Sequence, residues 1–537
     1  MARLKKRYWI SLSILMFIIV LSLFGWRSWQ EFRQEYGFSI NWYGAHINLS
    51  GLSFEQLTVY KESQFTVTAK DVLISWSKLS VQNLNIDWQL SDNKMVTDKT
   101  KNVVNVTTEK QNQSEFSYSS LLTIIYWLPS TIHIDSLRIY EQNRELFDVE
   151  MTATKQQEAI HLDVSSNNQY VANLSATLLF NQNDLRIDIQ NGVLTTTINQ
   201  FGVQNGKILL PFTGWITDNR FEFNNSGNAS VTIEKANLSD DFQFNQLNGT
   251  LTFKVQSLIP IKPNQISTTA KLALNKFNGI YKNSEIKSAA GNIYVDIKNQ
   301  QFTISVPSLN IQEINMGIAL QQVKLSGSYT APFNTPNKGI IICKKAQATI
   351  FSDSIFLQAN KLNLAKLPQQ LNLRLKQIQL KDILATYPAE GLAGDGAIDG
   401  LLPITLLSVN NKDGVTFKPI IKKGQLTTTH QGFLQFENSA LKNYAKNNPN
   451  MKILTDIIKN FHYTKLDGTV DYADDVAKLG LHIQGSNLDV EDGKAVNLNV
   501  TLEENIAKLL TSLQLSDQIS EPIRKRIEAH LKKESAK

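Results

Sequence analysis

The segment VNLNVTL at residues 496–502 alternates apolar and polar side chains at every position. Because successive side chains of a β-strand point to opposite faces, this alternation predicts a strand with one apolar and one polar face. The same period recurs in LGLHIQ at 479–484, LNLRL at 371–375, MGIAL at 316–320 and LRIDI at 185–189. The sequence therefore predicts a mainly β protein.

Asn-Gly and Asp-Gly pairs accompany these segments, and such pairs favour tight hairpin turns. They are Asn205-Gly206, Asn248-Gly249, Asp413-Gly414, Asp467-Gly468 and Asp492-Gly493. Strands joined by such turns pair antiparallel. The chain shows little of the strand–helix alternation that is typical of a Rossmann-like or barrel enzyme.

Helical spacing of apolar residues is confined to a few segments. Short helices are predicted at residues 117–128 (SYSSLLTIIYWL) and 450–461, and another from Glu503. A basic amphipathic segment after Ser520 either contacts anionic lipid or packs on the last strands. Residues 97–114 are weakly apolar and are predicted to be a long loop.

An uncharged, mostly apolar run occupies residues 8–26, which is close to the length needed to span a bilayer. The residues Arg3, Lys5, Lys6 and Arg7 precede it, and the aromatic residues Tyr8, Trp9, Trp26 and Trp29 mark its two ends. We predict an uncleaved anchor at residues 8–29 with a cytoplasmic N-terminus, because positive flanks stay inside and aromatic rings prefer the headgroup layer. A cleavable signal peptide is the alternative, although Gly25-Trp26 is a poor cleavage site.

The composition of the chain excludes several classes of partner and site for the exported part. Lys and Arg number 54 against 48 Asp and Glu in 537 residues, a net charge of +6, so nucleic acid is not an expected partner. Cys343 is the only cysteine, which excludes an intramolecular disulfide and a thiolate zinc site. A large exported chain without disulfides is more typical of a bacterial envelope than of a eukaryotic secreted protein.

Motifs for catalysis and metal binding are missing from the sequence. The seven histidines form no H-E-x-x-H or H-x-H arrangement, and there is no P-loop lysine motif or G-x-S-x-G elbow. The glycine-rich GDGAIDG at residues 394–400 lacks the spacing of a dinucleotide site and is predicted to be a tight turn. We therefore predict no enzyme, no catalytic residues, no metal and no cofactor.

Many alternating strands on one tether need a cover for their apolar faces. Two sheets can cover each other as sandwich domains, or one long sheet can curl into a gutter with an apolar inside that holds acyl chains. Composition does not separate these two arrangements.

Two sets of segments resemble a known family. The strands at residues 51–60, 69–76 and 81–88 resemble the start of the AsmA-like envelope proteins. Residues 394–403, 424–436, 454–466 and 496–512 resemble the YdbH branch of that superfamily, and the run LNVTLEENIAKLL is the most distinctive. Residues 150–390 match only in their strand pattern.

This resemblance implies a bridge-like fold: an inner-membrane tether followed by an elongated, twisted antiparallel β-sheet groove that carries phospholipid across the periplasm. It further implies a small outer-membrane lipoprotein that extends the sheet at the C-terminal end. About 30 strands at about 4.8 Å each give a reach on the order of 140 Å, which is less than the width of a periplasm. Such a partner is therefore needed to complete the span. Its docking site would be the open edge of the last strand.

The resulting domain prediction has six parts. They are a basic N-terminus at 1–7, the anchor at 8–29, an AsmA-like β region at 30–95, a polar loop at 96–118, the middle of the groove at 119–390, and a YdbH-like β region with terminal amphipathic helices at 391–537. The predicted groove residues are Leu371, Leu373, Leu375, Leu479, Leu481, Ile483, Val496, Leu498 and Val500. Ordinary sheet core is the alternative role for each. A non-transporting β scaffold is the alternative for the whole protein, and a hydrolase with a site assembled in three dimensions is a distant third.

Overall fold

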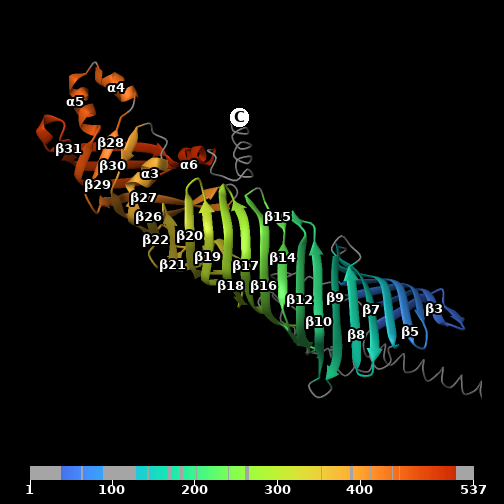
Figure 1. Cartoon of the computed structure of the whole chain (residues 1–537). Helices are drawn as coiled ribbons and strands as arrows, with labels where there is room; N and C mark the ends of the chain where they lie inside the picture. The colour runs from blue at the N-terminus through green and yellow to red at the C-terminus, as the bar shows by residue number, and fades with distance from the viewer. Residues whose placement is uncertain are drawn as a thin grey trace, which may run out of the picture. The chain divides into compact units, whose positions relative to one another are not determined.

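A computed structural model of the chain shows a mainly β protein with few short helices (Figure 1). The structure describes residues 38–61, 65–88, 129–141, 144–166, 171–181, 185–200, 202–239, 241–259, 265–351, 353–386, 391–411, 414–437, 439–446 and 448–515. The chain divides into two compact units. The first holds the residues up to Thr197 together with Leu209–Gly227, and the second holds Ile198–Ile208 and the residues from Asn228 onward.

The first unit is a sheet in which consecutive strands pair side by side. Its strands are β1 (Phe38–Tyr43), β2 (His46–Asn48), β3 (Gly51–Lys61), β4 (Phe65–Ile74), β5 (Lys78–Trp88), β6 (Thr131–Glu141), β7 (Arg144–Gln156), β8 (Ala159–Ser166), β9 (Val171–Asn181), β10 (Arg186–Ile198), β12 (Gly206–Ile216) and β13 (Arg220–Asn225). The strands β5 and β6 pair parallel, with Lys78 opposite Thr131. The predicted antiparallel sheet is therefore mostly antiparallel and not entirely so, since β6 runs in the same direction as β5.

The second unit is also a sheet of strands that pair side by side, and some of its strands are longer than those of the first unit. They are β11 (Val203–Gln204), β14 (Ala229–Ile233), β15 (Lys235–Asn237), β16 (Phe242–Leu258), β17 (Ser267–Tyr281), β18 (Ser284–Lys298), β19 (Gln301–Asn315), β20 (Ala319–Pro332), β21 (Ile340–Ile350), β22 (Asp353–Leu357), β23 (Asn360–Asn363), β24 (Gln369–Gln379), β25 (Leu392–Gly394), β26 (Ala397–Asn411), β27 (Gly414–Thr428), β28 (Gly432–Phe436), β29 (Phe461–Ala473), β30 (Val476–Ser486) and β31 (Val496–Asn505). All of the pairings described for this unit are antiparallel.

Helices of the second unit lie near its C-terminal strands. They are α3 (Leu380–Thr386), α4 (Ser439–Lys446), α5 (Pro449–Ile458) and α6 (Ile506–Leu515). The helices predicted at residues 450–461 and from Glu503 are confirmed as α5 and α6, although Phe461 already belongs to β29 and Glu503 still belongs to β31. The predicted anchor, the loop at 97–114, the helix at 117–128 and the segment after Ser520 lie outside the described residues.

Some of the predicted turns are correct. Asn205 and Asp492 adopt the left-handed backbone conformation of a turn, with φ of 51° and 54°. Asn411 pairs with Gly414 across the hairpin that joins β26 to β27.

Two other turn predictions were wrong, because each pair lies inside a strand. Asn248-Gly249 lies inside β16 and Asp467-Gly468 inside β29. In the GDGAIDG segment only Asp395 and Gly396 lie between strands, and Gly400 already lies in β26. Conversely, Met316 and Ile318 of the alternating run at 316–320 lie in the turn between β19 and β20.

Bulged strands recur through the second unit, and several of the bulges place a residue other than glycine at positive φ. In three of them a side chain of the neighbouring strand accepts a hydrogen bond from the bulged N–H. The pairs are Ser288 with Asn278 Oδ1 at 2.7 Å, Gln377 with Asp399 Oδ1 at 2.7 Å, and Lys423 with Asp471 Oδ1 at 2.8 Å. The φ values of the bulged residues are 51°, 59° and 55° in the same order. The cap satisfies an N–H that the bulge takes out of the ladder.

Removal of such a cap should loosen its bulge. We expect Asn278→Ala to raise amide exchange around Ser288 about fivefold, which corresponds to about 1 kcal/mol for one lost hydrogen bond. Hydrogen-exchange mass spectrometry of peptides from β17 and β18 measures this. Lys276→Ala, an exposed position on the same strand, is the control, and equal exchange in both variants would contradict the role of the cap.

Candidate functional site

One row of side chains crosses the second unit from β16 to β31, following cross-strand partners that share a face of the sheet. Its members are Leu247, Phe277, Ala289, Ile311, Val323, Ala348, Ile355, Leu375, Gly400, Leu426, Gly468, Leu481 and Val500. At the bulge between β20 and β21, Val323 and Ala348 belong to the same buried cluster. We call this set the apolar row. At about 4.8 Å per strand it is on the order of 60 Å long, measured along the sheet.

The structure places all nine predicted groove residues on the face that carries the apolar row. They come from three strands: Leu371, Leu373 and Leu375 from β24, Leu479, Leu481 and Ile483 from β30, and Val496, Leu498 and Val500 from β31. Leu375 and Leu481 are members of the row itself, and Leu498 lies opposite Ile483. Whether these side chains contact lipid stays a prediction.

These residues differ in their exposure. Val500 is 38 % exposed and Ile483 only 4 %. The other seven are half-buried. The face is therefore open over β24 and part of β30 and β31, and closed at Ile483.

Helix α5 explains the closed end. Its Ile457 belongs to one buried cluster with Phe461, Leu466 and Ile483, against which Val496 and Leu498 also pack. The end of α5 is held in place by Asn487, which donates to the carbonyl oxygens of Asp456 at 2.9 Å and Ile457 at 3.2 Å. Leu481 also packs against this cluster, so Leu481, Ile483, Val496 and Leu498 have the character of sheet core, whereas the leucines of β24 do not pack in it.

Two glycines of the apolar row, Gly400 and Gly468, leave space for the leucine side chains of neighbouring strands. A Cβ on Gly400 would lie 2.8 Å from Leu426 Cδ2 and 2.9 Å from Leu375 Cδ1. A Cβ on Gly468 would lie 3.2 Å from Leu426 Cβ and 3.3 Å from Leu481 Cδ2. The neighbouring leucines therefore occupy the space above both glycines, which explains why Gly468 serves a strand rather than a turn.

Ten of the thirteen members of the apolar row were not predicted from the sequence; only Leu375, Leu481 and Val500 were. No site residue was predicted on β16 to β22, where Ala289, Ile311 and Val323 are 3 to 5 % exposed. The bulged residues Ser288 and Gln322, both at positive φ, precede Ala289 and Val323 and break the two-residue period there. The Phe242, Phe244 and Phe277 rings, whose centroids lie 5.6 to 6.5 Å apart, were a signal that could have been used.

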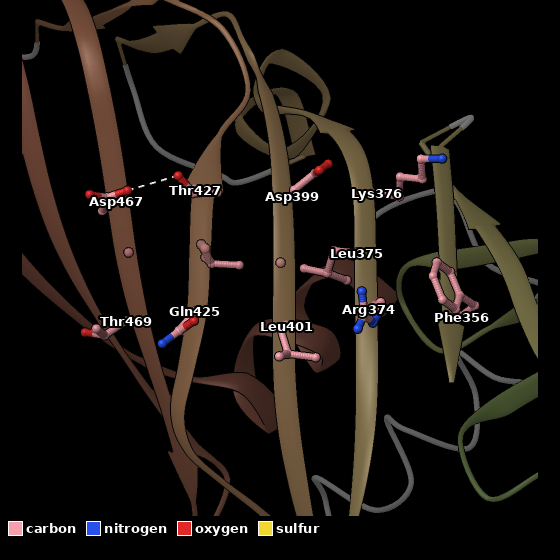
Figure 2. Close-up of a pocket in the computed structure, with 13 residues that line it drawn as sticks. Phe356, Arg374, Leu375, Lys376, Asp399, Leu401, Gln425, Thr427, Asp467 and Thr469 are labelled. Atoms are coloured by element: carbon pink, nitrogen blue, oxygen red, sulfur yellow. Dashed lines mark hydrogen bonds between the residues drawn. The ribbon is translucent and has the colours of Figure 1, made fainter. Parts of the chain in front are cut away.

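The opposite face of the same strands is mostly polar, although Phe356 and Leu401 also lie on it (Figure 2). A shallow depression of about 690 Å³ lies on these strands, and its lining includes Arg374, Asp399, Gln425, Asp467 and Thr469. In Figure 2 these side chains come from four adjacent strands, spread across the sheet rather than directed at one point. The sheet therefore has an apolar and a polar side, as the alternation predicts.

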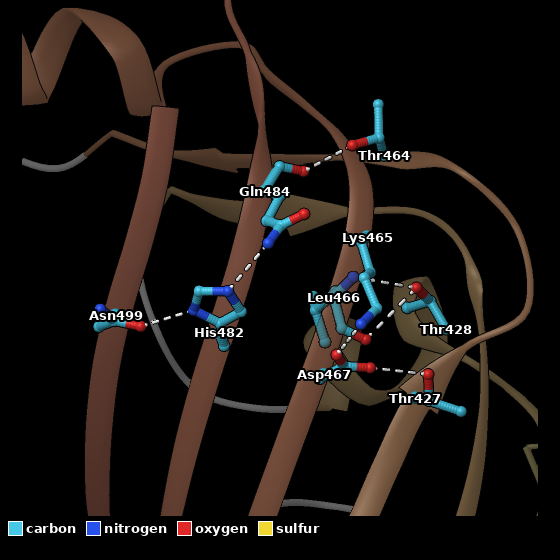
Figure 3. Close-up of polar contacts among 9 residues, drawn as sticks. All are labelled: Thr427, Thr428, Thr464, Lys465, Leu466, Asp467, His482, Gln484 and Asn499. Carbon is cyan, nitrogen blue, oxygen red and sulfur yellow. Dashed lines mark hydrogen bonds and ion pairs between the residues drawn. The ribbon is translucent and has the colours of Figure 1, made fainter. Parts of the chain in front are cut away.

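Hydrogen bonds link the polar side chains across strands (Figure 3). Lys465 Nζ lies 2.6 Å from Asp467 Oδ2, and the Thr427 hydroxyl donates to Asp467 Oδ1 at 2.9 Å. His482 Nδ1 lies 2.7 Å from Asn499 Oδ1 on the next strand. The hydrogen bond from Lys465, with help from Thr427, holds the pKa of Asp467 below its usual value.

These polar groups have structural partners. Asp467 is bound to Lys465 and Thr427, and Asp399 caps the bulge at Gln377. Among the residues that the structure describes, no group of three or more His, Cys, Asp and Glu side chains could hold a metal ion. In the same residues no helix is long and apolar enough to cross a membrane; the predicted anchor with Tyr8, Trp9, Trp26 and Trp29 lies outside them.

A β-rich chain with a long, partly open apolar face is suited to apolar cargo. Residues 227–528, more than half of the chain, match the YdbH-like family, described as intermembrane phospholipid transport protein YdbH. The chain belongs to this family. The family is one of lipid transport proteins and not of enzymes, and its intermembrane role implies a location in the cell envelope.

The match begins at Gly227, the last residue of the first unit, continues through the second unit and covers the whole apolar row. Comparison with curated proteins and with solved structures found no significant match. The family assignment therefore rests on the unit that also carries the apolar row.

The lowered pKa of Asp467 predicts a contribution to acid stability. The contribution is present above the ordinary Asp pKa of about 4 and is lost as the pH falls through the lowered native pKa, because the unfolded state then binds more protons. Lys465→Met should flatten this loss, since it removes the main cause of the shift. Thermal melting between about pH 5 and about pH 2.5 measures it. Lys478→Met, which breaks an exposed pair with Glu503 at 3.0 Å, is the control, and identical curves for wild type and Lys465→Met would contradict the prediction.

Proposed function

We propose that the protein carries phospholipids between the inner and outer membranes, with their acyl chains held along the apolar row. The continuity of this row supports the proposal, since its members from Leu247 to Val500 follow one another through strand pairings and one shared buried cluster. The polar opposite face keeps the same strands soluble. In this proposal the sheet forms a groove, and the half-buried leucines of β24 line its open part.

Hydrophobic contact supplies both the affinity and the mobility that such a role needs. Each buried methylene contributes about 0.8 kcal/mol, so an acyl chain of about 16 carbons is retained strongly. Because this attraction is non-directional, a lipid can slide along the row without breaking specific bonds. No chemical step is required, which agrees with a family of transport proteins.

The proposal includes a single-pass inner-membrane anchor at residues 8–29 and a periplasmic location for the rest of the chain. It also includes a small outer-membrane lipoprotein as partner. Within the described residues β31 pairs only with β30, so its other edge is open to strand addition. An added strand would extend the row beyond Val500, which is already 38 % exposed.

A photo-crosslinker in place of single residues tests the contact with lipid. We expect phospholipid adducts in cells from Leu375 and Leu479, because both are half-buried on the apolar face. Lys376, which follows Leu375, and Lys478, which precedes Leu479, are matched controls. Each is adjacent to its test position in the same strand and therefore points to the opposite face. Ile483 should label weakly, because it lies in the cluster with Ile457 of α5. Mass spectrometry of the adducts identifies the lipid.

Equal labelling on both faces, or none on the apolar face, would contradict a lipid-bearing row. A folded protein that lacks bound lipid would instead favour the non-transporting scaffold.

A charge on the open part of the row should block transport. We expect Leu375→Asp to reduce lipid flux between the membranes at least tenfold, because a carboxylate in an acyl path is poorly solvated. Lys376→Asp is the control on the opposite face of β24. Circular dichroism and limited proteolysis must show a folded Leu375→Asp variant; an unfolded variant would point to ordinary core, and unchanged flux in a folded variant would contradict the path.

A further inference from the structure

Exposed apolar side chains gather at one end of the first unit. Their exposed fractions are 57 % for Trp42, 71 % for Tyr43, 88 % for Ile47, 111 % for Leu49, 37 % for Ile74 and 102 % for Trp76. Elsewhere in this unit the exposed large apolar residues are scattered, as at Phe147 and Val171. Clustered exposed apolar residues mark an interaction site, whereas single ones do not.

The strand pairings bring these residues to the same corner of the sheet. Ile47 pairs with Leu52, and Leu52 pairs with Ile74. Leu49 lies in the hairpin between β2 and β3, and Trp76 lies in the next hairpin, between β4 and β5. We call Trp42, Tyr43, Ile47, Leu49, Ile74 and Trp76 the exposed tip.

Most of the exposed tip continues the apolar face of the first unit, whereas Tyr43 lies opposite Gln56 and on the other face. On that face Ala69, Val72, Val81 and Ile134 form a buried cluster, with Leu57 and Leu79 packed against it. Trp42 lies opposite Leu57, and Ile74 lies opposite Leu79. The face that is 3 to 6 % exposed at its centre thus opens to solvent at the edge formed by β1 and β2.

The chemistry of the exposed tip fits an interface and not a charged partner. Residues 38–53 (FSINWYGAHINLSGLS) contain no Asp, Glu, Lys or Arg. Tryptophan and tyrosine, with apolar rings and a polar atom, prefer the boundary between lipid and water, and isoleucine and leucine add apolar area.

We propose that the exposed tip inserts into the lipid–water interface of the bilayer that holds the predicted anchor, so that the apolar face of the first unit opens onto the membrane. This inference rests on the anchor at residues 8–29 of the proposed function. The link from there to β1 is residues 30–37, which span at most about 28 Å when fully extended. So short a link keeps the edge strands β1 and β2 near the headgroups.

An environment-sensitive NBD fluorophore on single cysteines tests this in the full chain. Cys343→Ser removes the only native cysteine, and Leu49→Cys or Trp76→Cys then carries the probe. Val171→Cys, 54 % exposed in the same unit, is the matched control. Each protein is reconstituted into vesicles of phosphatidylethanolamine and phosphatidylglycerol, with or without brominated acyl chains.

We expect blue-shifted emission and at least about twofold stronger quenching by brominated lipid at 49 and 76 than at 171. Water-like emission at 49 and 76 would overturn the proposal. Blue-shifted emission without quenching would also overturn it, since a second copy or another segment of the chain would then cover the exposed tip. Equal quenching at all three positions would show unspecific contact and overturn it as well.

The outcome is separable from that of the transport proposal. Photo-crosslinking at Leu375 and Leu479 reports on the second unit, whereas the fluorophore reports on the first. Lipid adducts without quenching would leave transport intact and remove only the membrane contact of the exposed tip.

Discussion

A sheet with one apolar and one polar face must keep its apolar face from water, and the second unit depends on how it does so. The apolar row runs through strands whose partners are set by backbone hydrogen bonds, so its members cannot be moved singly. At one end α5 covers the row, where Ile457 packs with Ile483. Over β24 the leucines remain half-buried. In the proposed function acyl chains cover that open part, because hydrophobic contact is non-directional and lipid can cover an apolar face as protein side chains do.

Bulges and glycines adapt the sheet to this demand. Each capped bulge shifts the register while an Asn or Asp of the neighbouring strand satisfies the displaced N–H, as Asn278 does for Ser288. Bulges also increase the local twist of a strand, which a long sheet needs in order to curl. Gly400 and Gly468 let leucines from neighbouring strands lie over the backbone. The polar side chains serve the same architecture, since Asp399 and Asp471 act as caps and not as ligands or catalysts.

The two ends of the chain have different surroundings in this account. The exposed tip of the first unit is rich in residues that favour a lipid–water interface, while β31 of the second unit pairs only with β30 among the described residues. The apolar residues of the exposed tip suit a contact with lipid, whereas an unpaired strand edge suits the addition of a partner strand. The two ends of the chain are therefore suited to two different kinds of contact. Family membership supplies the cargo class, phospholipid, which neither geometry specifies.

The two-residue alternation alone determined that the protein is mainly β and that the leucines of β24, β30 and β31 share faces within their strands, because side-chain direction in a strand follows from local geometry. A different local pattern, apolar residues at helical spacing, determined the positions of α5 and α6. Only the tertiary structure decided that these strands join one row from Leu247 to Val500, that β5 and β6 pair parallel, and that Gly468 lies inside a strand. The reason is physical: strand partners, bulges and the cover that α5 gives to Ile483 arise from contacts between residues distant in sequence, which no local pattern encodes.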